Sequence, residues 1–149
     1  MVTKKQIEEF LAAEAVAVAG VSRNPKKFGY TAFQEVRKKG LNVVPVNPNL
    51  PEIDGMTCYK SVSDLPPGIN ALWILTGKQN TLDVVRQAVD RGIRNIWIQQ
   101  SCDTPEALDL LKDKEVNLIY KQCLLMHYKP HSFHKFHGNL KRWFGRMPK

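Results

Sequence analysis

A polar loop at residues 20–29 carries the side chains best suited to bind an anion. It follows an apolar run and contains Ser22, a hydroxyl donor, with the cations Arg23, Lys26 and Lys27. A helix that starts where this loop ends adds unpaired N–H groups and the positive end of its dipole. The loop therefore predicts a site for a phosphate-bearing ligand.

Polar residues also follow three later apolar runs. They are Asn47-Pro48, Thr76-Gly77-Lys78 and Gln99-Gln100-Ser101. Turns require such residues in any case, so each stretch alone is typical of an ordinary loop. Together with the first loop, they would converge at the carboxyl edge of a parallel sheet, where such folds bind ligands. We therefore expect one crevice there.

The elements that must position these loops alternate along the chain. Strands are predicted at 15–21, 42–48, 70–77, 95–101 and 116–121, with a short strand, a turn and a helical turn in 56–65. Helices are predicted from a Thr3/Gln6 capping box, over 29–39, over 80–91, and from Asp103 with Glu106 to about Lys114. This alternation predicts an α/β, Rossmann-like, doubly wound parallel sheet with strand order 3-2-1-4-5-6.

Charge divides the chain into a near-neutral body and a basic tail. Of the 22 Lys and Arg residues, seven lie in residues 121–149, which contain no Asp or Glu, while residues 1–120 hold 15 basic and 14 acidic residues. We therefore expect a single domain over 1–128 and a tail over 129–149. No apolar run is long enough to cross a bilayer, and the first ten residues do not resemble a signal peptide, so a cytoplasmic protein is expected. The three cysteines are widely spaced, which favours reduced thiols.

The tail predicts an amphipathic helix, because aromatic and apolar residues recur in it at helical spacing. These residues are Phe133, Phe136, Leu140, Trp143 and Phe144. The favoured interpretation is docking on the body or on a second subunit, as in a homodimer. An anionic membrane surface and a nucleic acid are the alternatives. His131, His134 and His137 are three residues apart, a spacing that lets one metal reach two of them, so no metal site is expected.

A nicotinamide or flavin dinucleotide fits the loop poorly. The dinucleotide fingerprint needs a second glycine where Ser22 stands, and an acidic residue after the second strand, where Asn47-Pro48 stand. An NAD(P)-dependent oxidoreductase or epimerase is therefore only the alternative hypothesis.

The chain resembles the small CoA-binding proteins, which are similar to the CoA-binding domain of the succinyl-CoA synthetase α subunit. The matching segments, within about residues 12–128, are AVAGVSRNPKKFGY, VVPVNP, GMTCYKSVSDLP, IWIQ and LIYKQCLLMH. The resemblance does not include the synthetase's phosphohistidine domain, so ligase activity is not expected.

The resemblance implies a ligand, coenzyme A or an acyl-CoA, and the residues that hold it. The pyrophosphate would lie on Gly20, Val21, Ser22, Arg23, Asn24, Lys27, Phe28 and Gly29. Asn47 and Pro48 would border the adenine and ribose; Thr76, Gly77 and Lys78 would line the other side; and Gln100 and Ser101 would approach the pantetheine arm.

No catalytic residue is predicted. The sequence shows no paired carboxylates at a strand end and no Ser-His-Asp or Cys-His arrangement. Cys123 is the one candidate nucleophile expected near the crevice, and packing as a small buried thiol is the favoured interpretation. We expect binding without chemistry.

Overall fold

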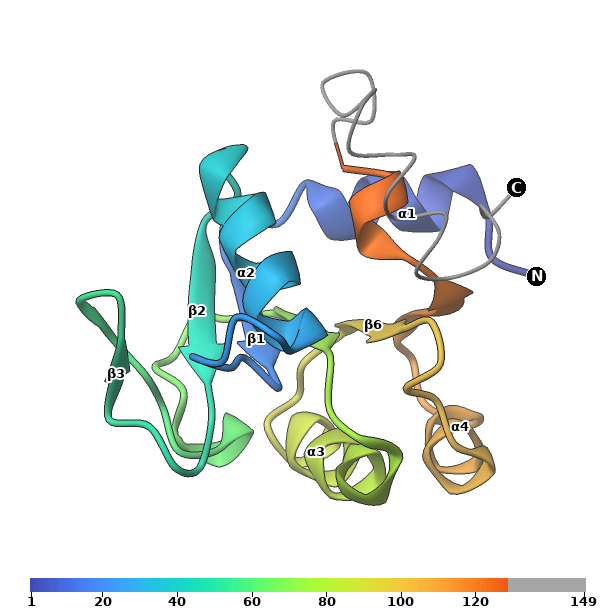
Figure 1. Cartoon of the computed structure of the whole chain (residues 1–149). Helices are drawn as coiled ribbons and strands as arrows, with labels where there is room; N and C mark the ends of the chain where they lie inside the picture. The colour runs from blue at the N-terminus through green and yellow to red at the C-terminus, as the bar shows by residue number, and fades with distance from the viewer. Residues whose placement is uncertain (129–149) are drawn as a thin grey trace.

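A parallel five-stranded sheet forms the centre of the computed structural model, which describes residues 1–128 (Figure 1). In spatial order the strands are β2 (Val43–Val46), β1 (Val16–Ala19), β5 (Ala71–Ile74), β6 (Asn95–Gln99) and β7 (Asn117–Gln122). Every neighbouring pair is parallel. The α/β class with a doubly wound sheet is therefore confirmed.

Helices cover both faces of the sheet (Figure 1). On one face lie α1 (Lys4–Leu11), α2 (Phe28–Lys38) and the short 3-10 turn η2 (Leu124–Met126). On the other lie α3 (Lys78–Asp90), α4 (Pro105–Leu111) and the 3-10 turn η1 (Val62–Asp64). Each face has its own apolar core, so both faces of the central strands are buried. This is why the first strand reads as an unbroken apolar run.

The predicted strand order is wrong at one edge. The segment expected to form the third strand contributes only an isolated parallel bridge, between Tyr59 and Val46 of β2. Its first two residues form β4 (Met56–Thr57), which pairs with β3 (Glu52–Ile53) as a separate antiparallel hairpin. The rest of the predicted order holds.

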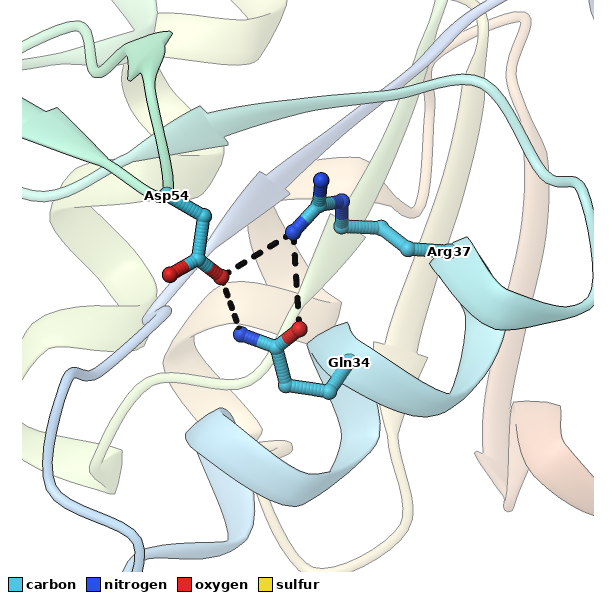
Figure 2. Close-up of polar contacts among 3 residues, drawn as sticks. All are labelled: Gln34, Arg37 and Asp54. Atoms are coloured by element: carbon cyan, nitrogen blue, oxygen red, sulfur yellow. Dashed lines mark hydrogen bonds and ion pairs between the residues drawn. The ribbon is translucent and has the colours of Figure 1, made fainter.

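The β3–β4 hairpin is anchored to α2 by a polar cluster (Figure 2). Its turn is Asp54-Gly55, with φ of 51° and 81°, as a tight hairpin turn requires. The carboxylate of Asp54 forms an ion pair with Arg37 at 3.0 Å and accepts a hydrogen bond from the amide of Gln34. At the other end, the Arg23 guanidinium donates to the Glu52 carbonyl at 2.9 Å. The hairpin is therefore tied both to the loop after β1 and to α2.

Helix starts follow the sequence signals, with one correction. The Thr3/Gln6 capping box of α1 is confirmed. At α4 the cap is Thr104 rather than Asp103, because Thr104 Oγ1 accepts the N–H of Ala107 at 3.1 Å and Pro105 begins the helix. The helix also ends at Leu111, before the predicted Lys114.

Gln99 joins two parts of the core beneath the carboxyl edge. Its side chain is 1% exposed, and its Oε1 accepts both the indole N–H of Trp73 at 3.0 Å and the backbone N–H of Leu124 at 3.2 Å. The hydrogen bond from Leu124 fixes the start of η2 against β6. Gln99 therefore serves the core.

The predicted tail over 129–149, its helix, its dimer, membrane or nucleic-acid contacts and its histidines lie outside the described residues. Within residues 1–128, no helix is long and apolar enough to span a membrane.

The two candidate caps of α4 can be separated by mutation. Thr104→Ala removes the oxygen that accepts an N–H at the first turn, so we expect the free energy of unfolding to fall by about 1 kcal/mol. Asp103→Ala is the control and should lower it by less than half as much. Urea denaturation measures both. A larger loss for Asp103→Ala than for Thr104→Ala would contradict the assignment.

Candidate functional site

A cleft of about 1000 Å³ opens at the carboxyl edge of the sheet. The loops after β1, β2, β5 and β6 all contribute to it, as expected from the topology. Of the residues predicted to hold a ligand, all but Arg23 and Asn24 line it. That placement brings the predicted residues together; their contact with CoA stays a prediction.

Two glycines build the floor of the cleft by close backbone approach. Gly20 has φ of +101°, and a Cβ there would lie 2.6 Å from the carbonyl carbon of Leu75. A Cβ on Gly29, in the first turn of α2, would collide with the carbonyl oxygen of Gly20. The loops after β1 and β5 and the start of α2 can therefore pack together only if both residues lack a side chain.

The loop after β1 is held by its own side chains. The hydroxyl of Ser22 accepts the N–H of Asn24 at 3.0 Å, and the Asn24 carboxamide accepts the N–H of Lys26 at 3.0 Å. Ser22 retains its hydroxyl hydrogen for a ligand. Asn24 and Arg23 both use their side chains within the protein, which agrees with their position outside the cleft lining.

Two helices begin at the cleft without a side-chain cap. The N-cap of α2 is Lys27 and that of α3 is Gly77, and neither makes a capping hydrogen bond. At α1 and α4, by contrast, threonine hydroxyls cap the first turn. Lys27 and Lys78 add positive charge beside the two uncapped ends, and both line the cleft. This arrangement suits an anion with more than one phosphate.

Asn47 positions two loops at the rim. Its Nδ2 donates to the Val21 carbonyl at 2.7 Å and its Oδ1 accepts the N–H of Asn49 at 2.7 Å. Both ends of the carboxamide are thus used by the protein. The side chain joins the loop after β2 to the loop after β1, and Pro48 lines the cleft beside it.

The loops after β5 and β6 are joined by a chain of hydroxyl groups. The Thr76 and Thr81 hydroxyls lie 2.9 Å apart, and Thr81, which is fully buried, donates to the Cys102 carbonyl at 2.7 Å. Between these loops, Gln100 and Ser101 reach the cleft, and Ser101 has φ of +76°. This wall is therefore fixed before any ligand arrives.

The cysteine at the cleft is Cys102, which sequence reasoning did not select. The expectation that Cys123 lies near the crevice is wrong: its side chain is fully buried in the core on the α1 and α2 face, where burial raises the pKa of its thiol. Burial, with the Asp103 carboxylate as a second cause, raises the pKa of Cys102 to about 11. Both thiols are protonated at neutral pH.

Several further lining residues were not predicted. They are Ala19, Val46, Asn49, Lys60, Ser61, Val62, Leu75, Asn80, Asp83, Val84, Gln87 and Cys102. Signals for some were present. Lys60 and Ser61 follow the expected third strand, whose carboxyl end belongs to the same edge. Asn80, Asp83, Val84 and Gln87 share one face of α3 at helical spacing. Asp83 is the one carboxylate in the lining, and residues 1–128 hold no group of three metal-ligating side chains.

Solved structures share this fold. The chain matches a conserved hypothetical protein from Pyrococcus furiosus with a TM-score of 0.72 and 31% identity, covering 76% of this chain and 97% of that one. A hypothetical protein from Pyrococcus horikoshii matches with a TM-score of 0.77 and 25% identity, covering 92% of this chain and 94% of that one.

Curated relatives include both a short protein and a ligase subunit. YneT, an uncharacterized protein of Bacillus subtilis, is 24% identical over 123 residues, which cover 82% of this chain and 91% of YneT. The α subunit of an ADP-forming acetate–CoA ligase of Pyrococcus furiosus is 29% identical over 93 residues, covering 62% of this chain. The match spans 20% of that subunit's length.

A family model described as a CoA binding domain matches residues 14–129, which include every strand of the sheet and the whole cleft lining. The chain belongs to the CoA-binding domain family.

Proposed function

We propose that the chain binds coenzyme A or an acyl-CoA in the cleft and acts as a binding module rather than a catalyst. The observation that carries the proposal is the meeting of two uncapped helix starts, those of α2 and α3, with Lys27 and Lys78 at one cleft. Such a site holds a diphosphate through backbone N–H groups, helix dipoles and cations. Family membership supports CoA as the source of that diphosphate.

The sheet order suggests how the ligand lies. The uncapped helices follow β1 and β5, which are adjacent at the centre, so the diphosphate lies there. The β2 side offers Pro48 as an apolar surface for a nucleoside, and the β6 side offers Gln100 and Ser101 to the pantetheine amides. From the Tyr59 bridge across to β6 the edge spans roughly 19 Å, since parallel strands lie about 4.8 Å apart. That span suits a long ligand laid across the strands.

The charges in the cleft favour CoA over NAD and favour binding over chemistry. The residues after β2 are Asn47, Pro48 and Asn49, so no carboxylate is placed there to hold a ribose 2′-hydroxyl of NAD. With a pKa of about 11, the Cys102 thiol is a poor nucleophile at neutral pH. Asp83 has no second carboxylate beside it in the lining, and its Oδ2 accepts the Gln87 amide at 3.0 Å.

Calorimetry tests the ligand directly. We expect CoA to bind one site per chain with a dissociation constant below about 100 µM, and NAD to bind at least tenfold more weakly. The reason is that the cleft provides phosphate contacts without the ribose carboxylate. No heat of binding with CoA at millimolar concentration would contradict the proposal.

The close approach at Gly29 provides a mutational test. In Gly29→Ala the new methyl group meets the Gly20 carbonyl and pushes the loop away from α2, so CoA affinity should fall more than tenfold. The matched control is Gly77→Ala at the start of α3, where a Cβ meets only the movable Gln79 side chain and affinity should fall less than threefold. Equal losses in the two variants would argue against the loop geometry described above.

Alkylation of Cys102 tests two claims: the raised pKa of its thiol, and the binding of the ligand next to it. Below pH 11 its alkylation by iodoacetamide should accelerate about tenfold per pH unit, because only the thiolate reacts and roughly one thiol in a thousand is ionised at pH 8. Saturating CoA should slow the reaction. Peptide mass spectrometry identifies the alkylated residue, with Cys102→Ser as the control. A rate that levels off near pH 8 would contradict the raised pKa. A rate that CoA leaves unchanged would contradict the location of the ligand beside Cys102.

A further inference from the structure

We infer that Lys60 binds the phosphate on the ribose of the ligand and so makes the cleft selective for a 3′-phosphorylated nucleotide. This inference rests on the proposed function, because it assigns one group of CoA to one side chain. Neither the sequence pattern nor the family match assigns Lys60 a role.

The backbone places Lys60 at the nucleoside end of the cleft. The preceding residue, Tyr59, is bound to the end of β2 on both sides: its N–H donates to the Pro45 carbonyl at 3.0 Å, and its carbonyl accepts the N–H of Asn47 at 2.9 Å. Lys60 is therefore the first residue beyond a bridge that extends the sheet by one position past β2. It lies beside the end of β2, next to Asn47, and not in the loops after β1 and β5 where the two uncapped helices start.

The segment after Lys60 is fixed to α3. Gln87 Oε1 accepts the Ser63 N–H at 3.2 Å, and Arg91 donates to the carbonyls of Ser63 and Pro66, each at 3.1 Å. The buried Val62 packs in the core between them. The main chain that carries Lys60 is thus held in place, while the lysine side chain itself is exposed at the cleft.

The charges that face this end of the cleft leave Lys60 available for an anion. Lys27, Lys60 and Lys78 are the three lysines of the lining. Lys27 and Lys78 lie at the starts of α2 and α3, where the diphosphate is expected. Within residues 1–128 the ion pairs are Arg37–Asp54 and Arg94–Glu115, so none involves Lys60. Asp83, the acidic residue of the lining, receives its hydrogen bond from Gln87.

A CoA molecule presents two separate phosphate sites, its diphosphate and the phosphate on its ribose. The ribose lies between the diphosphate and the adenine, so its phosphate must fall on the nucleoside side of the central loops. Lys60 is the lining cation on that side. A charge-assisted contact between an ammonium group and a phosphate would then reward CoA over the same molecule without its 3′-phosphate.

The test compares CoA with 3′-dephospho-CoA by calorimetry, on the unmodified chain and on three variants. Lys60→Gln removes the proposed contact, Lys27→Gln removes a cation from the diphosphate end, and Lys114→Gln removes one exposed charge outside the cleft lining. The unmodified chain should prefer CoA by about tenfold. In Lys60→Gln that preference should vanish, with affinity for CoA reduced about tenfold and affinity for 3′-dephospho-CoA unchanged.

The control variants make the result specific. Lys27→Gln should weaken both ligands by a similar factor and keep the preference, and Lys114→Gln should leave both affinities unchanged. The preference should also shrink as salt is added, because an exposed ion pair is screened. A preference that survives in Lys60→Gln, or that disappears in Lys27→Gln instead, would overturn the inference while leaving CoA binding intact. Failure of the unmodified chain to bind either form would instead overturn the proposed function, and the inference with it.

Discussion

The close backbone contact between Gly29 and Gly20 is the constraint on which the cleft depends. It brings the start of α2 against the end of β1, and Gly20 in turn lies against the loop after β5. Side chains are excluded at both positions, and α2 begins at the cleft without a side-chain cap. The loop needs no dinucleotide fingerprint to achieve this: Ser22 and its neighbours close the turn by hydrogen bonds within the loop.

Other interactions hold this contact in place. Asn47 ties the loop after β2 to the loop after β1, and the Thr76–Thr81 pair ties the loop after β5 to the one after β6. Arg23 joins the first loop to the β3–β4 hairpin, and Asp54 joins that hairpin to α2, while the expected contact of Arg23 with phosphate stays a prediction. Polar residues that resemble ligand contacts in the sequence are thus partly scaffold. Under the proposed function, the lysines of the lining and the uncapped helix starts bind the ligand.

Much of the fold was predictable because its signals are local. Buried parallel strands read as continuous apolar runs, and Thr3 with Gln6 marks a helix start wherever that helix later packs. The edge of the sheet was not predictable in the same way. Asp54-Gly55 is a hairpin signal that competes with the expected third strand, and the hairpin formed. Only the bridge between Tyr59 and Val46 remains of that strand. Lys60, which follows this bridge and lines the cleft, was not predicted as a site residue.

The cleft lining likewise contains residues that local signals predict and residues whose place depends on packing. Loop residues next to strand ends were predictable from topology, because parallel strands end at a common edge. Helical spacing shows that the α3 residues Asp83 and Gln87 share a face, but not that this face lines the cleft, because that depends on how η1 packs along the helix. Cys123 was expected at the cleft and Cys102 lies there, for a similar reason. The chain turns into the core at η2, and residue spacing does not show this turn.

A crystal structure of the chain grown with CoA tests the central claim most directly. We expect the diphosphate at the starts of α2 and α3, the adenosine toward β2 and the pantetheine toward β6. A diphosphate bound away from both helix starts would contradict it, as would a nucleotide lying in the reverse direction across the sheet.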